Sequence, residues 1–263
     1  MIFRELLDSL RRDDEGWQVA VGEDWLQGRT AFGGLQAALC VRALRDHVPA
    51  DLPLRALQTT FVAPVPAGMV RLQGRVLRIG GFTVHAECRI VDGEQTLCLV
   101  VAIFGKSRGS ELAIAPPQPD AGRAADGGRE FRYVEGVTPA FTQHFVMRWS
   151  QGGFPFQGAS EPRTCIHVRH REAQALDETH LIALADTVPS PGLSVLRKRA
   201  MASSMTWTLE LFDQRTQFAF DAFWRMDTEV TAGADGYLGQ SAQLWTPDGR
   251  LAALSRQSVV VFG

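Results

Sequence analysis

One aspartate lies where a carboxylate is electrostatically disfavoured, at the end of an apolar helical run. The stretch IALADTVPSPG, residues 182–192, begins as a helix and places Asp186 shortly before two prolines. A helix C-terminus carries partial negative charge, which costs a nearby carboxylate roughly 0.3–1 kcal/mol. This field and the apolar surroundings both favour the neutral acid, so we expect a pKa raised towards that of a general base. The alternative is an exposed aspartate in a turn.

A second polar group falls on the apolar face of the last predicted strand. In LAALSRQSVVVFG, residues 251–263, alternation puts Gln257 on the face of Ala253 and Val259, away from Arg256. A buried amide without hydrogen-bond partners costs about 1–3 kcal/mol. Gln257 is therefore either a core residue bonded to nearby backbone or a group that orients a reactant.

A hydroxyl group is the third candidate. In AMASSMTWTLELF, residues 200–212, alternation places Ser204 with Thr206, opposite Met205 and Trp207. The pattern indicates a half-buried strand with hydroxyl groups on its outer face. If another unit of the protein covers that face, Ser204 can belong to a site between units.

The elements that position these residues recur in two halves of the chain. In each half a helical pattern, residues 31–49 and 181–188, is followed by four strand-like runs. Asp177 is a possible N-cap of the second helix. In both halves the last two runs flank an Asp-Gly turn, at residues 92–93 and 248–249. The runs are 54–65, 70–79, 82–91 and 95–105, then 200–212, 218–226, 236–245 and 251–263, with two further strands predicted at 141–150 and 163–170.

This repetition predicts an internal duplication with an α+β fold. A helix followed by an antiparallel meander favours a sheet curled around that helix, and two such units give a double hot-dog. We expect an N-terminal unit at residues 1–105, a Gly- and Pro-rich linker at 106–130 and a C-terminal unit at 131–263. The alternative is one antiparallel domain whose hairpins look alike by chance.

Composition excludes several classes of function. With a net charge of −2 and a pI of about 6.3, the 263-residue chain has no bulk attraction for nucleic acid or an anionic membrane. The first 16 residues resemble a short amphipathic helix rather than a signal peptide, and no run is long enough to span a bilayer. We expect a cytoplasmic protein without metal or cofactor. Its cysteines show no metal-binding or disulfide spacing and lie at Cys40, Cys88, Cys98 and Cys165.

The ordered set of motifs resembles the acyl-CoA thioesterase II group, the TesB-like members of the hot-dog superfamily. In the first half the resemblance rests on FGGLQAALCVRAL, LRALQTTFVAPVPAGMV and VLRIGGFTVHAECRIVDGE. In the second half it rests on LIALADTVPSP, SSMTWTLELF and QLWTPDGRLAALSRQ. The resemblance implies hydrolysis of acyl-CoA thioesters without a metal ion or a covalent intermediate.

The same resemblance implies roles for individual residues. In that family an Asp, a Thr and a Gln hold the attacking water, and these positions fall on Asp186, Ser204 and Gln257. Ser204 replaces the threonine and keeps the hydroxyl, whereas Thr206 replaces an aspartate. The resemblance also implies a backbone N–H at a helix N-terminus as oxyanion donor, and the FGG stretch supplies Gly33 and Gly34 for it. The alternative is a glycine-rich entry loop needed only for its backbone geometry.

Two other functions stay open. A hot-dog protein can bind acyl-CoA or an acyl carrier without efficient hydrolysis, and the changes at residues 204 and 206 keep this possibility open. An enoyl-CoA hydratase or dehydratase needs an Asp–His pair, which the Asp186 motif lacks. We also expect a homo-oligomer, a dimer of double hot-dogs.

Overall fold

The computed structural model describes residues 1–121, 124–172 and 175–262. The α-helices are α1 (Phe3–Asp8), α2 (Gly33–Leu44), α3 (Glu178–Leu184) and α4 (Gly192–Val195), with short 3-10 helices η1 (Glu23–Trp25), η2 (Ala125–Gly127) and η3 (Ala140–His144). The strands are β1 (Arg11–Asp13), β2 (Gly16–Val21), β3 (Leu26–Gln27), β4 (Thr30–Ala31), β5 (Leu54–Phe61), β6 (Gly68–Ile79), β7 (Thr83–Asp92), β8 (Gln95–Gly105), β9 (Arg129–Phe131), β10 (Phe145–Gln151), β11 (Arg163–His170), β12 (Met201–Leu211), β13 (Trp224–Ala234), β14 (Tyr237–Trp245) and β15 (Leu251–Phe262).

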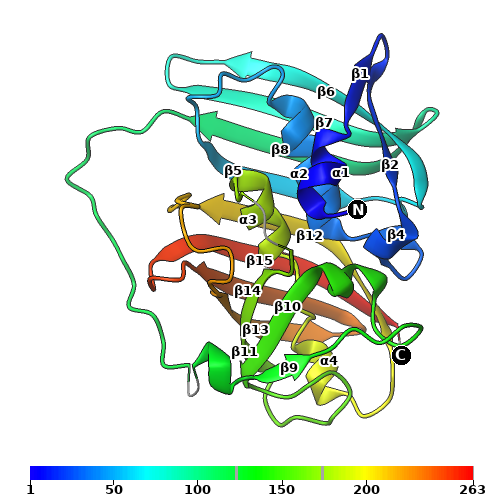
Figure 1. The fold of residues 1–263 in the computed structure, drawn as a ribbon, viewed down its shortest axis with the longest axis vertical. Helices are drawn as coiled ribbons and strands as arrows, with labels where there is room; N and C mark the ends of the chain where they lie inside the picture. Colours follow the sequence, from blue (N-terminus) through cyan, green and yellow to red (C-terminus); the bar gives the residue numbers. More distant parts are fainter. Residues whose placement is uncertain (122–123, 173–174, 263) are drawn as a thin grey trace.

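A single large antiparallel sheet connects the two halves of the chain. Within the described residues it has 13 strands in the order β1-β2-β6-β7-β8-β5-β12-β15-β14-β13-β11-β10-β9. The halves meet at β5 and β12, where Gln58 lies opposite Thr208. Figure 1 shows the N-terminal strands in the upper half of the molecule and most of the C-terminal strands in the lower half.

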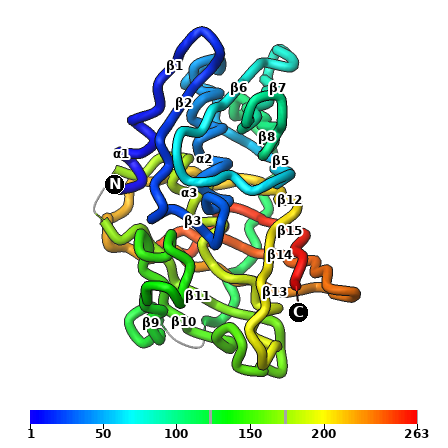
Figure 2. Tube along the Cα trace, turned by 90° about the vertical axis from the view of Figure 1, so that its right-hand side faces the viewer, coloured from blue at the N-terminus to red at the C-terminus, as the bar shows by residue number. Residues whose placement is uncertain are grey.

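The helices α2 and α3 lie side by side on one face of this sheet (Figures 1 and 2). Arg45, just after α2, pairs with Glu178 at the start of α3, with 2.5 Å between Nε and Oε1. At the other end, Gly33 at the start of α2 lies against Asp186, just after α3. The two helices therefore run antiparallel, and the C-terminus of one lies beside the N-terminus of the other.

The hydrophobic core lies between these helices and the inner face of the sheet. Leu35 and Leu39 of α2, Ile182 of α3 and Trp207 of β12 are at most 1% exposed. Burying each such side chain contributes about 1.5–3 kcal/mol, so the core holds both helices at defined positions on the strands.

Both predicted Asp-Gly turns are confirmed. Gly93 and Gly249 have φ angles of 57° and 83°, a region that glycine reaches without steric cost. The predicted N-cap is also confirmed, because the Asp177 side chain accepts a hydrogen bond from the Thr179 N–H.

Several predicted elements have different bounds in the structure. The first predicted helix is shorter, as α2, and the predicted strand 54–65 ends at Phe61. The strand β2, GWQVAV, was not predicted; it follows the β1–β2 turn and pairs with β6. The predicted last strand includes residue 263, which lies outside the described residues.

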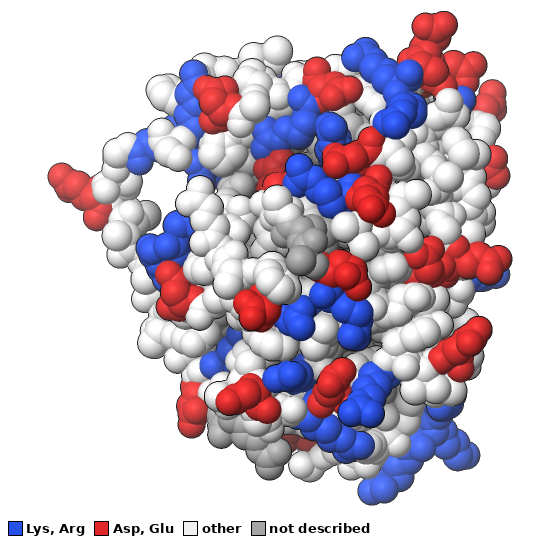
Figure 3. All heavy atoms as spheres, in the orientation of Figure 1, with Lys and Arg blue, Asp and Glu red and all other residues white. Residues whose placement is uncertain are grey.

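The long connection after β8 runs along the left-hand side of Figure 1 before the chain enters η2 and β9. The boundaries of the linker, residues 106–130, stay a prediction. Among the described residues, no helix is long and apolar enough to cross a membrane. Basic and acidic side chains are interspersed over the face drawn in Figure 3.

Candidate active site

Asp186 lies where the end of α3 meets the start of α2. The last helical residue of α3 is Leu184, and prolines at 189 and 191 follow shortly afterwards. A Cβ atom added to Gly33 would lie 2.7 Å from Asp186 Oδ2 and 2.9 Å from Cζ of Phe61. The missing side chain at residue 33 therefore lets the carboxylate approach the backbone of the α2 start.

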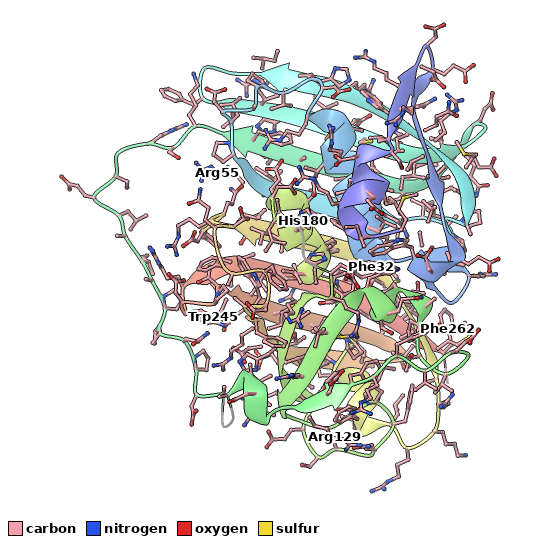
Figure 4. All side chains as sticks on the ribbon, viewed as in Figure 1. Phe32, Arg55, Arg129, His180, Trp245 and Phe262 are labelled. Atoms are coloured by element: carbon pink, nitrogen blue, oxygen red, sulfur yellow. The ribbon has the colours of Figure 1, made fainter. Side chains whose placement is uncertain are left out.

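The neighbouring helix offsets the unfavourable position of the acid. The N-cap residue of α2, Phe32, supplies no side-chain hydrogen bond, so the first N–H groups of the helix are left for other partners. Figure 4 labels Phe32 in the middle of the molecule, between the upper and lower halves. The partial positive charge of this N-terminus favours a carboxylate, which compensates for the C-terminus of α3 on the same side.

The pKa of the Asp186 carboxyl group is raised to about 7, because burial disfavours its charged form. Hydrogen bonding from Gln257 and from the backbone N–H of Gly34 opposes this rise. A carboxylate with these properties accepts a proton near neutral pH and can return it, which is what a general base requires.

The other two candidate side chains form a chain of hydrogen bonds that ends at the acid. Gln257 donates from Nε2 to Asp186 Oδ1 over 2.5 Å. Its own Oε1 accepts from the Ser204 hydroxyl over 3.2 Å and from Gln240 Nε2 over 3.0 Å. Ser204 therefore contacts Gln257, and it reaches Asp186 only through that amide.

A β-bulge brings Ser204 to this face of the sheet. Ser204 lies opposite Val259, whereas Thr206 lies opposite Ser258 and Trp207 lies opposite Gln257. The register shift between residues 204 and 206 places Ser204 on the face of Trp207, although simple alternation predicted the face of Thr206. That expectation was wrong because a bulge inserts one residue without changing the composition of the strand.

The structure also changes the interpretation of the glycines. Gly34 was predicted as an oxyanion donor, but its N–H interacts with the Asp186 carboxylate. Gly33 is the preceding residue and lies against the same carboxylate. Gly34 therefore helps to hold the acid, and an oxyanion role for either glycine stays a prediction.

Sequence reasoning missed two residues of the site, Gln240 and Phe61. Gln240 has the same signal as Gln257, an amide on a strand face whose next positions are the apolar Ala242 and Leu244. The Phe61 ring, at the end of β5 in the N-terminal half, lies against Gly33 at the start of α2. No sequence signal marks it, since an aromatic residue at a strand end is usually part of the core.

No group of three or more metal-ligating side chains occurs in the part of the chain that the structure describes. His167 and His170 of β11 lie on opposite faces of the sheet, because they are three residues apart in one strand. His170 is 3% exposed between Phe3 and Phe145, and burial lowers its pKa to about 3. It is therefore a neutral core residue.

Two models of one protein family match the chain. The acyl-CoA thioesterase N-terminal domain matches residues 21–105, and the acyl-CoA thioesterase C-terminal domain matches residues 115–261. No curated protein matches the sequence.

Solved structures share the whole fold at low sequence identity. A conserved protein of unknown function with a hot-dog fold from Alicyclobacillus acidocaldarius has a TM-score of 0.87 at 22% identity, covering 99% of this chain and 98% of the other. The tesB protein of Mycobacterium avium subsp. paratuberculosis has a TM-score of 0.80 at 12% identity, covering 99% and 98%. Acyl-CoA thioesterase II TesB2 of Mycobacterium marinum has a TM-score of 0.76 at 16% identity, with the same coverage. These similarities establish the double hot-dog fold.

Proposed function

The chain belongs to the acyl-CoA thioesterase family, and on this basis we propose that it hydrolyses acyl-CoA thioesters to the free acid and CoA. One observation carries the proposal. A largely buried carboxylate, Asp186, has a pKa raised to about 7 and is held between an amide and a helix N-terminus. This geometry suits a general base that activates water.

The proposed reaction divides the two carboxylate oxygens of Asp186 between two tasks. Oδ1 accepts the Gln257 amide and fixes the carboxylate, whereas Oδ2 faces Gly33 and Phe61 and takes a proton from water. The water oxygen bonds to the thioester carbon, and the N–H of Gly33 stabilises the oxyanion at the start of α2. When the C–S bond breaks, Asp186 returns its proton to the thiolate and is ready for another turnover.

A second candidate is a protein that binds acyl-CoA or an acyl carrier without efficient hydrolysis. One observation favours it. The N–H of Gly34 bonds to Asp186, so it is not available to stabilise an oxyanion. A hydratase has less support, because the Asp177–His180 pair that the structure contains involves a fully buried imidazole.

The test compares two aspartates that follow helices in the same way. Wild type, Asp186→Asn and Asp46→Asn are given acyl-CoAs of several chain lengths, and free thiol is measured. Asp46 lies after α2 as Asp186 lies after α3, but it bonds the Trp17 indole and is partly exposed. We expect Asp186→Asn to lower kcat by about a thousandfold or more and Asp46→Asn to leave it near the wild-type value.

The same experiment separates the alternatives. Thiol release that is equal in wild type and Asp186→Asn would remove Asp186 from the mechanism. Tight binding without thiol release would favour the binding protein, and hydration of an enoyl-CoA would favour the hydratase.

A further inference from the structure

A second buried glutamine lies beside Gln257 on the inner face of the sheet. In the strand register, Gln257 of β15 is directly opposite Gln240 of β14. Gln240 is 6% exposed, and its Nε2 donates to Gln257 Oε1 over 3.0 Å. Its Oε1 is buried and has no hydrogen-bond partner in the described part of the structure. An unsatisfied buried acceptor is costly, so packing alone does not explain a glutamine at this position.

The orientation of the Gln257 amide decides whether a hydrogen-bond donor or an acceptor faces the Asp186 carboxylate. With Nε2 towards the acid, Gln257 donates a hydrogen bond to the carboxylate, whereas the flipped amide would set Oε1 against another acceptor. The Ser204 hydroxyl cannot select between these orientations, because it can donate to Oε1 or accept from Nε2.

In the orientation that the structure shows, Nε2 of Gln240 donates, which favours the orientation in which Gln257 presents Oε1 to it. That orientation turns Nε2 of Gln257 towards Asp186. Hydrogen bonds in a chain also polarise one another, so the Gln240 donor strengthens the bond that Gln257 gives to the acid. We propose that Gln240 is a positioning residue, which keeps the Gln257 amide turned so that its N–H faces Asp186.

This inference rests on the proposed function, and its first test is kinetic. Gln240→Met removes the donor and keeps a side chain of similar length, and Gln240→Glu replaces the donor with an acceptor. The carboxylate of Gln240→Glu attracts Nε2 of Gln257 and turns Oε1 towards Asp186. We expect kcat to fall about tenfold in Gln240→Met and about a hundredfold in Gln240→Glu, with KM within about twofold of wild type.

The control is Gln243→Met, a glutamine of the same strand whose side chain lies on the opposite face. It should keep wild-type kcat. The rise of kcat with pH should have its midpoint about half a pH unit higher in Gln240→Met, because the ionised acid loses part of its hydrogen bonding. Wild-type kcat and an unchanged midpoint in a folded Gln240→Met protein would overturn the inference.

A measurement that does not depend on activity separates the two proposals. The Asp186 carboxyl carbon is labelled with ¹³C, identified by its loss in Asp186→Asn and titrated by NMR. A higher midpoint in Gln240→Met than in wild type supports positioning by Gln240 even if no acyl-CoA is hydrolysed, which would defeat only the proposed function. An identical midpoint in an active enzyme would leave hydrolysis standing and overturn the role of Gln240.

Discussion

The two ends of the α2–α3 helix pair are related by the duplication, yet they present different chemistry. The residues ALRDHVP at the end of α2, 43–49, match ALADTVP at the end of α3, 183–189. Each motif places an aspartate two residues after the last helical residue, Asp46 in one case and Asp186 in the other. Because the helices are antiparallel, each aspartate lies at the same end of the pair as the N-terminus of the other helix.

The helix starts at the two ends differ in what occupies them. At the start of α3, the side chain of Asp177 caps the N–H of Thr179, and Glu178 pairs with Arg45. The N-cap residue of α2, Phe32, supplies no capping side chain, and the helix begins with Gly33 and Gly34. At the start of α3, side chains of that end bond the N–H group and occupy the space beside it. The start of α2 instead leaves room for the carboxylate of Asp186 and a reactant.

The strands that the helices cover also differ between the two ends, in the polarity of their inner faces. Beneath the Asp186 end, β15 and β14 place Gln257 and Gln240 on the inner face. The buried inner positions of the corresponding strands β8 and β7 are all apolar: Cys98, Val100, Ala102 and Phe104 on β8, and Val84, Ala86, Cys88 and Ile90 on β7. An aspartate after the helix is therefore not sufficient. It becomes a candidate base only beside a helix start that lacks a cap from its own N-cap residue, and with an amide to hold it.

The largest effect that we expect from this difference is on how the free energy of unfolding depends on pH. The Asp186 pKa rises from 3.8 to about 7 on folding, so between these values the folded protein holds a proton that the unfolded chain has lost. The free energy of unfolding must therefore fall as pH rises through this window. At about 1.36 kcal/mol for each pKa unit, ionising Asp186 costs about 4 kcal/mol more in the folded protein than in the unfolded chain.

Asp186→Asn removes this titration. Urea unfolding at pH 5 and pH 8, which span about two of these pKa units, should show the variant losing about 3 kcal/mol less stability than wild type between the two values. Taking the difference between the two proteins cancels the contributions of other titrating groups. The same pH dependence in both would show that Asp186 ionises in the folded protein without a penalty.

A smaller effect is expected at the open helix start. In Gly33→Ala the new Cβ would lie 2.7 Å from Asp186 Oδ2 and 2.9 Å from Phe61 Cζ, so the carboxylate or the ring must move. We expect kcat to fall about a hundredfold, because displacing a catalytic group by less than 1 Å has effects of this size. Stability should hold, since alanine favours a helix more than glycine does.

The control for this variant is Gly81→Ala, where a Cβ meets no atom within 4 Å. Thiol release by the two variants at saturating acyl-CoA provides the measurement. Full activity of Gly33→Ala would mean that the close approach of acid and helix start has no part in catalysis.

The fold could be predicted from the sequence, and Asp186 could be singled out as a candidate, because both leave local patterns. Periodicity and Asp-Gly turns marked the repeated units, and Asp186 was conspicuous in an apolar run before prolines. The sequence does not show that α2 and α3 pack antiparallel. It therefore predicted the unfavourable field of the α3 C-terminus at Asp186, but not the favourable field of the α2 N-terminus. The face of Ser204 depended on a bulge, and the link between Gln240 and Gln257 depended on strand register. Neither leaves a signal in composition.

The smallest effect is expected at Ser204, which supplies one of two donors to Gln257 Oε1. Because Gln240 remains, Ser204→Ala should lower kcat only about three- to fivefold, and Ser204→Thr should stay within about twofold of wild type. Ser203→Ala is the matched control, since the Ser203 hydroxyl donates only to the carbonyl of its neighbour. If Ser204→Ala were as inactive as Asp186→Asn, the hydroxyl would have to contact the attacking water directly rather than act through the amide.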